Sequence, residues 1–423
     1  MESGEGDYRQ MNLKQPIYDL YGKLRQIYRM KKGQRFSWQN EKISVVFLMQ
    51  YTPSWGKLEL LYESLLENPL FDVHLVCVPE ELSDKENATY CYFREKGYQV
   101  INACMENGSW FDIKTLKPDY VFTTRPYDFY LPVEYQSHNM CTYTRLCNFS
   151  YGINLDKELA DMIFGQNSYM HTYMYFVEME SLVQEYQKAQ RLGHKLGLIH
   201  SACMGMIAID GFMKEVGKES PSWEFADAGL KVIWAPRWTT DKKLGGSNFF
   251  TYKDFMLDYF RENEDMNLLM RPHPLMFDNF IRTGEMTEAE VAEYKDKVQN
   301  AKNICFDMEK EYAHTFWQSD VLIADYSSII PEYFLTEKPL IFCITNMELT
   351  LLDNMKDILK GCYVVDSKDE LQDCLEMLRS GQDPKETIRK EMKQKLFGDT
   401  LGKSVELTTN WLIEDWRSHN AGD

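Results

Sequence analysis

The chain has 423 residues, which is too long for one ordinary hydrophobic core and typical of two domains. Apolar residues make up 44% of the sequence, so there is enough material to fill two cores. The net charge of −18 argues against a general nucleic-acid-binding protein, because such proteins need a positive surface.

The cellular compartment is indicated by three features of the sequence. No run approaches the ~18 apolar residues of a membrane span, and the N-terminus "MESGEGDYRQ" lacks the apolar core of a signal peptide. The ten cysteines form no Cys-x-x-Cys pair, and Cys77, Cys305 and Cys343 lie inside apolar runs. We interpret them as buried free thiols of a reducing compartment. The protein is therefore expected to be cytoplasmic, either free or peripheral on the cytoplasmic face of a membrane.

Residues 1–41 form a basic amphipathic N-terminal segment. Its part 14–35, "KQPIYDLYGKLRQIYRMKKGQR", holds seven Lys and Arg residues and one acid, Asp19. Apolar residues recur there at helical spacing, which places one apolar face beside the cations. Two interpretations stay open: a helix on a membrane surface, and a helix docked on its own protein with a solvated basic face.

Short apolar runs, separated by helix-like stretches, continue along the rest of the chain. An early series of expected strands is Ser44–Met49, Val73–Val78, Tyr98–Ala103, Tyr120–Thr124 and Thr144–Phe149. A second series is Lys231–Trp234, Met266–Met270, Ile304–Met308, Val321–Ala324, Pro339–Ile344 and Tyr363–Val365. Strands of this length that alternate with helices predict parallel sheets covered by helices on both faces.

Two such series predict two Rossmann-like domains that face a central cleft. We expect an N-terminal domain at 42–227, whose last part, 206–227, serves as a linker, and a C-terminal domain at 228–395. Residues 396–423 are predicted to form an amphipathic helix that crosses back over the domains. Ligands of such folds bind beyond the carboxyl ends of the strands, so the cleft is the expected site.

Three strand ends in the second half carry polar residues. "MNLLMRPHP" places Arg271 and His273 directly after a strand, each followed by a proline that restricts the backbone. Arginine offers a planar fork of donors to phosphate oxygens, and histidine can donate to an oxyanion. The alternative is a loop with a surface cation and a satisfied histidine.

The stretch "SDVLIADYSSIIPEYFL" ends another buried strand with Asp325, and Ser327 and Ser328 follow at the expected start of a helix. Two hydroxyls and free backbone N–H groups at that position favour an anion site, although serine at a helix start is also common for stability alone. "VIWAPRWTT" ends a third strand in Arg237, which is equally compatible with an exposed structural loop.

Other ligand motifs are absent or incomplete. "GDTLGKS" is one residue short of a P-loop and follows the strands instead of joining a strand to a helix. There is no Asp-x-Asp pair, and the eight histidines show no metal-binding spacing. We therefore expect neither a metal ion nor another cofactor.

The sequence resembles the CDP-glycerol glycerophosphotransferase family, which makes teichoic acids and related capsule polymers of the bacterial cell envelope. The resemblance rests on "KVIWAP", "LLMRPHP", "SDVLIADYSSIIPEYFLTEKPLIF" and "LFGDTLGKSVEL", which occur in order between residues 230 and 405. It implies a two-domain α/β fold of glycosyltransferase-B type, with an N-terminal acceptor domain and a C-terminal nucleotide-donor domain. It also implies metal-independent attack of an acceptor hydroxyl on the β-phosphorus of CDP-glycerol, which releases CMP.

The resemblance also implies roles for particular residues. Arg271 and His273 would contact the donor pyrophosphate, with His273 as the catalytic residue, and Ser327 and Ser328 would bind phosphate oxygens. Asp325 would shape their loop. Of the remaining substrate-binding candidates, Glu332 would contact the ribose or cytidine end, and Arg237 is the weaker assignment.

The expected partners are a CDP-linked donor, a glycan or polyol-phosphate acceptor, a membrane surface at residues 14–35 and no nucleic acid.

One departure concerns the acceptor side. Polymerases of the family carry a His-Gly-Thr motif in the N-terminal domain, whereas the corresponding stretch here, "CNFSYGIN", contains Ser150–Tyr151–Gly152 and no histidine. His138, His171 and His200 lie in the same half, but no motif assigns the general base to any of them. Alternatives are therefore a CDP-ribitol donor, a CMP- or other nucleotide-linked sugar donor, or a non-catalytic homologue that binds nucleotide or polymer.

Overall fold

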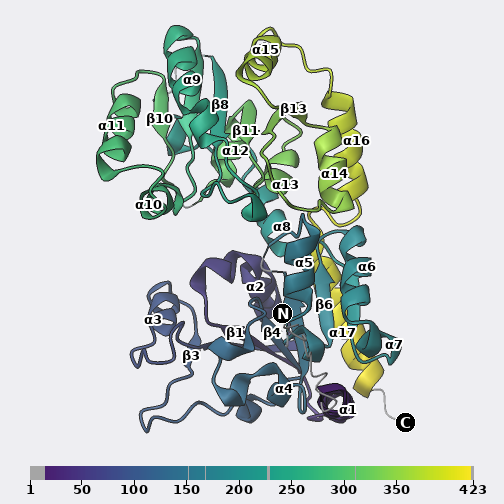
Figure 1. Cartoon of the computed structure of the whole chain (residues 1–423). Helices are drawn as coiled ribbons and strands as arrows, with labels where there is room; N and C mark the ends of the chain where they lie inside the picture. The colour runs from purple at the N-terminus through teal and green to yellow at the C-terminus, as the bar shows by residue number, and fades with distance from the viewer. Residues whose placement is uncertain (1–14, 151, 167, 226–228, 310, 421–423) are drawn as a thin grey trace, which may run out of the picture.

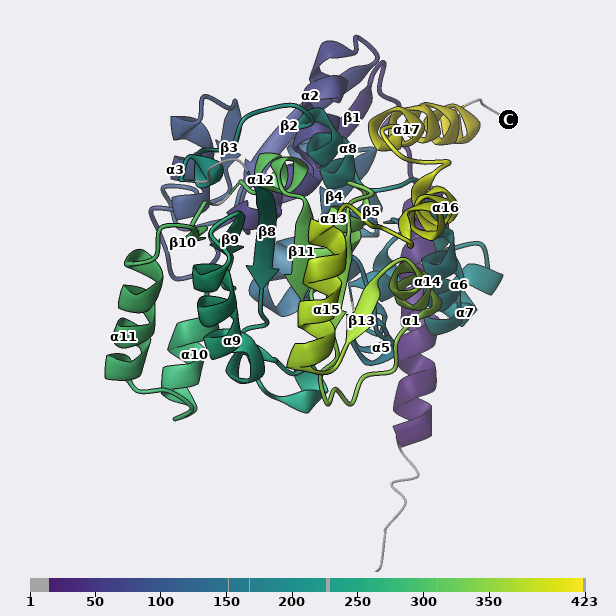
Figure 2. The ribbon, with the colours of Figure 1, turned by 90° about the horizontal axis from the view of Figure 1, so that it is seen from above.

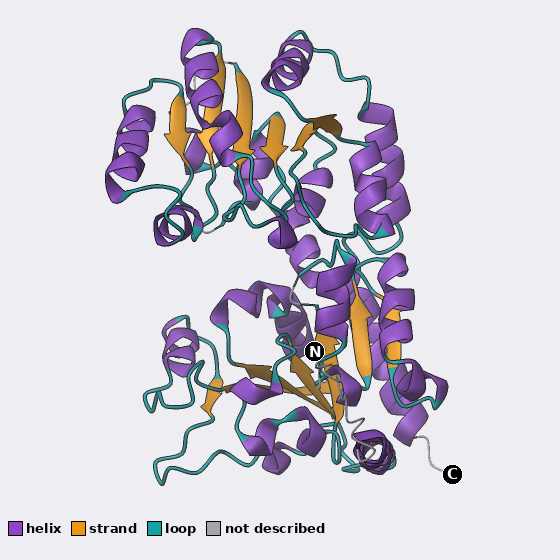
Figure 3. Cartoon of the chain, viewed as in Figure 1, coloured by secondary structure: helices purple, strands orange, loops and turns teal. Residues whose placement is uncertain are grey.

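The computed structural model describes residues 15–150, 152–166, 168–225, 229–309 and 311–420, with side chains from residue 21 onward. The described residues form two parallel sheets with helices on both faces, one above the other in Figure 1. This arrangement confirms the predicted α/β fold with two facing Rossmann-like domains. Figure 3 shows the strands of each sheet enclosed by helices.

The N-terminal sheet has seven strands in the order β3-β2-β1-β4-β5-β6-β7, and every neighbouring pair is parallel. The strands are β1 Ile43–Met49, β2 Phe71–Cys77, β3 Val100–Asn102, β4 Tyr120–Thr123, β5 Arg145–Phe149, β6 Met174–Val177 and β7 His200–Cys203. The helices are α1 Gln15–Gln34, α2 Glu59–Glu67, α3 Ala88–Glu95, α4 Ser137–Met140, α5 Lys157–Phe164, α6 Glu180–Ala189, α7 Arg191–Lys195 and α8 Ile207–Lys214. Short 3-10 helices up to the linker are η1 Thr52–Lys57, η2 Ile113–Leu116, η3 Asp128–Tyr130, η4 Val133–Tyr135, η5 Tyr169–His171 and η6 Pro221–Trp223, and η7 Lys242–Leu244 lies in the C-terminal domain.

The C-terminal sheet has six parallel strands in the order β10-β9-β8-β11-β12-β13. They are β8 Leu230–Ala235, β9 Met266–Met270, β10 Ile304–Phe306, β11 Val321–Ala324, β12 Leu340–Cys343 and β13 Tyr363–Val365. The helices are α9 Phe249–Glu262, α10 Met276–Arg282, α11 Glu288–Gln299, α12 Ala313–Gln318, α13 Ile330–Phe334, α14 Asp353–Lys360, α15 Lys368–Arg379, α16 Glu386–Phe397 and α17 Ser404–Asn420. Both strand orders reverse direction beside the first strand, and ligands of such sheets bind beyond the carboxyl ends at that reversal.

The chain passes between the domains twice. The first passage contains α8, whose Phe212 packs on Trp317 of α12 with ring centroids 5.3 Å apart. The second leads from α16, which packs on α14, to α17, which packs on α2 and α8. The prediction of a C-terminal helix that crosses back is confirmed, and Figure 1 shows α17 (yellow) beside the lower domain. The passages touch, because the Ser404 hydroxyl donates to Asp210 of α8 at 2.8 Å.

Helix α1 is docked on its own protein at one end, which was one of the two arrangements that the sequence left open. Met30 is buried, and a side chain in place of Gly33 would collide with the backbone of Cys141, so this end of the helix is docked on the N-terminal domain. Tyr21, Leu24 and Tyr28 are exposed on the same helix. Figure 2 shows α1 extending away from the body of the molecule.

The cysteines match the prediction of free thiols, and all ten are unpaired. Cys77 and Cys343 are buried, whereas Cys305 is only partly buried because β10 lies at the edge of its sheet.

Candidate active site

Asp325 links the strand ends of the C-terminal sheet. It directly follows β11, and it is almost fully buried. Its carboxylate accepts hydrogen bonds from the backbone N–H groups of Arg237 at 3.2 Å and Asn248 at 3.0 Å, and from the Ser247 hydroxyl at 3.2 Å. Burial raises the pKa of Asp325 to about 6, although these donors oppose the shift. Its carboxylate thus shapes the loops at the switch point and is itself shielded from a ligand.

Arg237 lies within the same loop arrangement. Its guanidinium donates to the Tyr326 carbonyl at 2.6 Å and stacks 5.1 Å above the Tyr326 ring. Burial lowers the pKa of Arg237. Gly245 approaches both residues with a φ of +102°, and a Cβ there would lie 2.8 Å from the Tyr326 ring. Only glycine fits this position without strain, and its presence lets the loop close over Arg237.

Arg271 is placed after β9 as predicted, but its guanidinium is held by the protein. It forms an ion pair with the buried Asp307, donates to the Glu309 carbonyl at 3.0 Å and stacks 4.7 Å above the Tyr312 ring. An arginine has five N–H donors, so some remain for a ligand. The sequence motif did not indicate Asp307, whose position relative to Arg271 is set by the pairing of β9 with β10.

His273 is exposed at the same edge of the sheet. Its Nδ1 accepts a hydrogen bond from the Leu275 N–H at 3.2 Å, and the ring lies 6.1 Å from that of Trp238. Loss of water around the ring, and then the nearby Arg237 cation, lower the pKa of His273. A neutral ring whose Nδ1 accepts carries its proton on Nε2. The imidazole can therefore donate from Nε2 to a ligand.

The two serines precede α13 instead of starting it. Ser327 is half-buried and accepts a hydrogen bond from the Ile329 N–H at 3.5 Å, whereas Ser328 is exposed. α13 is only five residues long and has Pro331 in its first turn. Glu332, on this helix, accepts a hydrogen bond from the Tyr312 hydroxyl. Burial raises the pKa of Glu332, against the effects of Tyr312, Lys57 and Arg271.

The loop after β5 joins the two domains. The Tyr326 hydroxyl donates to Asp156 at 2.5 Å, and Asn354 donates to the Asn154 carbonyl at 2.9 Å. Backbone hydrogen bonds from Lys157 to Thr350 and from Leu352 to Leu155 extend this contact. The carboxyl-end loops of both sheets therefore meet. Within the stretch that replaces His-Gly-Thr, Ser150 and Gly152 are described, whereas Tyr151 lies outside the described residues.

A small pocket lies at the switch point of the N-terminal sheet, between the ends of β1 and β4. Its lining residues are Leu48, Gln50, Tyr51, Thr123, Thr124, Arg125, Tyr127 and Leu131. The Arg125 guanidinium lies 4.7 Å from the ring centroids of both Tyr51 and Tyr130. Aromatic faces beside a cation are suited to a sugar or polyol that carries phosphate.

Two charged residues of the N-terminal domain were missed by the sequence interpretation. Lys57 ends η1 after β1, and Glu178 directly follows β6. The Lys57 ammonium is close enough to lower the pKa values of both Glu178 and Glu332. The signal for Glu178 was its position after a strand, but β6 itself was not recognised.

The fold is similar to those of solved structures of two kinds. A structure of the wall teichoic acid polymerase TagF is 13% identical, with a TM-score of 0.58, over 96% of this chain and 99% of that one. A UDP-GlcNAc 2-epimerase from Neisseria meningitidis, bound to UDP-GlcNAc, is 11% identical, with a TM-score of 0.59, over 88% and 100%. At these identities the comparison shows the fold alone. The full sequence matches no curated protein.

Fold and site together define a two-domain protein of glycosyltransferase-B type whose polar strand ends meet between the domains. Residues 226–410 match the family model of the CDP-glycerol:poly(glycerophosphate) glycerophosphotransferases. This match covers the domain that carries the candidate site, and it confirms the predicted resemblance to the CDP-glycerol glycerophosphotransferase family.

Proposed function

We propose that this protein transfers glycerol phosphate, or a related alditol phosphate, from a CDP-linked donor to a teichoic-acid or capsule-type glycan acceptor and releases CMP. One observation carries the proposal. The region that matches the family model brings His273, Ser327 and Arg271 to the carboxyl edge of one sheet, where parallel α/β sheets bind their ligands. TagF, one of the similar structures, has also been solved with CDPG.

The donor site supplies hydrogen-bond donors to a phosphoryl group. In phosphoryl transfer, negative charge spreads over the transferred group and the leaving group, so preorganised donors and cations stabilise the transition state. His273 Nε2–H and the hydroxyls of Ser327 and Ser328 are suited to phosphate oxygens. Arg271 remains held by Asp307 and contributes through its other N–H groups and its charge.

The acceptor is proposed to bind at the N-terminal switch point. The pocket between β1 and β4 opens beside Arg125, which could pair with an acceptor phosphate, and the rings of Tyr51 and Tyr130 offer faces for a sugar. The pocket lies at the carboxyl ends of the N-terminal strands. The loops at these ends contact the loops at the carboxyl ends of the C-terminal strands, so the pocket is on the side of its domain that faces the donor site.

The test is a panel of donors with CMP release as the readout. CDP-glycerol, CDP-ribitol and a CMP-linked sugar are each offered with oligo(glycerol phosphate), oligo(ribitol phosphate) or an N-acetylhexosamine disaccharide glycoside. We expect acceptor-dependent CMP release from a CDP-alditol. Release from the CMP-sugar alone would make the protein a glycosyltransferase, and binding of CDP-glycerol without CMP release from any pair would make it a non-catalytic homologue.

We also propose that α1 contacts an anionic membrane surface. Its exposed Tyr21, Leu24 and Tyr28 follow helical spacing, and exposed cations including Lys23 and Arg25 lie beside them. Such a helix lies in the headgroup region with its apolar side chains inserted. Among the described residues, no helix is long and apolar enough to cross a bilayer.

A further inference from the structure

Glu178 is a buried carboxylate at the edge of the N-terminal sheet that faces the other domain. It directly follows β6 and is 2% exposed, and among the described residues no donor lies in good hydrogen-bonding geometry to either carboxylate oxygen, although its own backbone N–H and Ser150 are near enough to favour the charged form. The Ser150 hydroxyl lies nearby and favours the charged form, but it donates to the Gly152 carbonyl. A buried carboxylate without a donor is unfavourable, and such groups are characteristic of functional sites.

The groups that face Glu178 come from four elements. Lys57 of η1 is a cation, and burial is the main cause that lowers its pKa. Tyr169 of η5, Tyr175 of β6 and Cys203 of β7 also feel the Glu178 charge, and burial raises the pKa of all three. The phenols and the thiol are therefore neutral near pH 7. Burial raises the pKa of Glu178 to about 7, against its own backbone N–H, Ser150 and Lys57.

Glu178 is connected electrostatically to the donor side. The Lys57 ammonium interacts with both Glu178 and Glu332. Glu332 belongs to α13, directly after the paired serines, and it interacts with Arg271. Glu178 and the candidate phosphate-binding residues therefore share one charged region between the domains.

The histidines of the N-terminal domain lie elsewhere. His138 belongs to α4, which precedes β5; His171 ends η5, which precedes β6; and His200 begins β7. All three are thus at the amino ends of their strands, opposite the edge that meets the C-terminal domain. His194 is in α7, before β7, and His74 is inside β2. None of these five positions suits a base that acts between the domains.

We propose that Glu178 is the general base that takes the proton from the acceptor hydroxyl. This inference rests on the proposed transferase function and assigns the role that the sequence left without a residue. In the step, a bond forms between the acceptor oxygen and the β-phosphorus of the CDP-linked donor. The bond from that phosphorus to the CMP oxygen breaks, CMP leaves with the electron pair, and the proton moves to the Glu178 carboxylate.

The burial of the Glu178 carboxylate protects the donor from hydrolysis in this mechanism. With no acceptor bound, the carboxylate is covered, so it cannot activate water against the donor. Binding of the acceptor must uncover it, and the acceptor hydroxyl then supplies the missing hydrogen-bond partner. Hydrolysis of CDP-glycerol in the absence of acceptor should consequently be slow.

The test compares Glu178→Gln with Glu180→Gln, using the donor and acceptor of the panel that give CMP release in the wild type. Glu180 lies two residues away and is exposed, which makes it a matched control. Glu178→Gln is expected to lower kcat at least ~100-fold, the scale of losing a general base, with the KM and Kd for CDP-glycerol unchanged. Glu180→Gln should behave as the wild type. Turnover of Glu178→Gln within about threefold of wild type overturns the proposal.

The pH profile separates a base from a structural group. A base acts when deprotonated, so wild-type kcat/KM should fall as the pH drops below about 7, the pKa of Glu178. Glu178→Asp should keep this acid limb at lower turnover, and Glu178→Gln should lose it. The wild-type profile is informative even if a variant does not fold: no acid limb between pH 6 and 8 contradicts the assignment.

The proposed function and the role of Glu178 fail in different ways. If the wild type releases no CMP with any acceptor, the transferase function fails, and the assignment of Glu178 fails with it. If the wild type is active and the acid limb persists in Glu178→Gln, only the assignment fails.

Discussion

His273 has one ring nitrogen committed to its own loop. Because Nδ1 accepts the Leu275 N–H and the pKa is lowered, the ring is neutral near pH 7, and Nε2 carries the donor. Pro272 and Pro274 on either side restrict the backbone, so little entropy is lost when the ring binds a phosphate oxygen.

His273→Ala and Ser327→Ala are each expected to lower kcat for CMP release at least ~100-fold, because each removes a preorganised donor to the transferred or leaving phosphate. The measurement is CMP release under saturating CDP-glycerol. Ser418→Ala is the control, since Ser418 is exposed on α17 and bonds only to the neighbouring Asp415 carbonyl and His419. Near-normal turnover of both site variants would refute their assignment to the donor site.

The sequence motifs predicted which residues lie at the candidate site, but they did not predict the hydrogen bonds and ion pairs that fix the side chains there. Arg271 and His273 follow their strand as the sequence predicted, whereas Ser327 lies in the loop after β11 and not at the predicted helix start. The ion pair of Arg271 with Asp307 joins residues from the ends of different strands, and no local pattern encodes it. Glu178 escaped notice for a related reason, since neither of the two glutamates in "YFVEME" belongs to a recognisable motif.

Helix α1 has one end docked on the N-terminal domain and, toward its other end, an exposed apolar stripe formed by Tyr21, Leu24 and Tyr28. Deleting residues 1–35 would also remove Met30 from the N-terminal core. Substitution of the stripe is the sharper experiment. The double variant Leu24→Ser/Tyr28→Ser is expected to weaken binding to phosphatidylserine vesicles at least about tenfold, because burying a large apolar side chain contributes ~1.5–3 kcal/mol. Vesicle sedimentation measures the change.

Two comparisons support the membrane interpretation of this result. Leu192→Ser alters an exposed leucine on α7 and should leave binding unchanged. Binding should also weaken with salt and with zwitterionic phosphatidylcholine in place of phosphatidylserine, because each cation near an anionic surface contributes ~1 kcal/mol. Equal binding by the wild type and the double variant would argue against the stripe as the contact.

The strand predictions succeeded where apolar runs stand between clear boundaries. All eleven expected strands are present, and β9, β11 and β13 have the predicted limits. β6 and β7 were missed. β6 lies in a run of aromatic and methionine residues without a turn signal, and β7 is an edge strand of small or polar, half-buried residues. Their place in the sheet is decided by the pairing of β6 with β5 and of β7 with β6, which local sequence does not encode.

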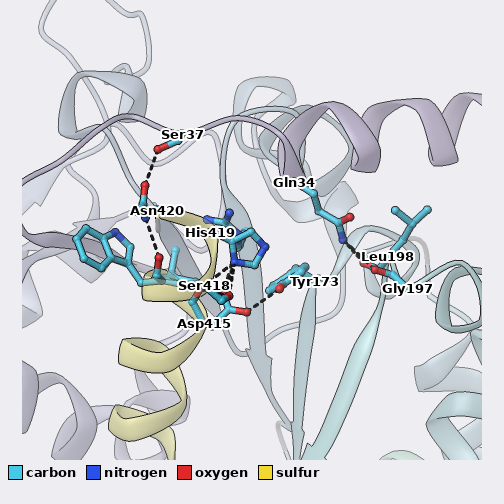
Figure 4. A network of polar contacts seen from close by, with 12 residues as sticks. Gln34, Ser37, Tyr173, Gly197, Leu198, Asp415, Ser418, His419 and Asn420 are labelled. Carbon is cyan, nitrogen blue, oxygen red and sulfur yellow. Dashed lines mark hydrogen bonds and ion pairs between the residues drawn. The ribbon is translucent and has the colours of Figure 1, made fainter. Parts of the chain in front are cut away.

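At the scale of the whole molecule, α17 connects the C-terminal domain to the N-terminal sheet. Its Asp415 accepts hydrogen bonds from the hydroxyls of Tyr120 at 2.6 Å and Tyr173 at 2.7 Å, and it lies 3.9 Å from buried Arg145. Figure 4 shows Asp415 and Tyr173 in this network, with Asn420 bonded to Ser37. The helix is thus fixed to the N-terminal domain by polar contacts near both of its ends.

Asp415→Ala is expected to destabilise the protein by about 3–5 kcal/mol, because it removes the carboxylate paired with buried Arg145 and leaves the Tyr120 and Tyr173 hydroxyls without their acceptor. Urea unfolding followed by circular dichroism measures this loss. Ser418→Ala, on the same helix, should stay within about 0.5 kcal/mol of wild type. Equal stability of the Asp415 variant and the wild type would show that Asp119 and the rings of Tyr120 and Tyr173 are enough to stabilise the Arg145 cation.

The two passages of the backbone between the domains have a consequence for motion. They run side by side, since Gly205 packs against Thr400 and Ser404, and the Ser404 hydroxyl bonds to Asp210. Two adjacent covalent connections resist twisting of one body relative to the other, whereas a single linker would permit it. The bonds of Tyr326 to Asp156 and of Asn354 to Asn154 form a further contact between the carboxyl-end loops, so a rotation that separates the donor and acceptor loops has to break them.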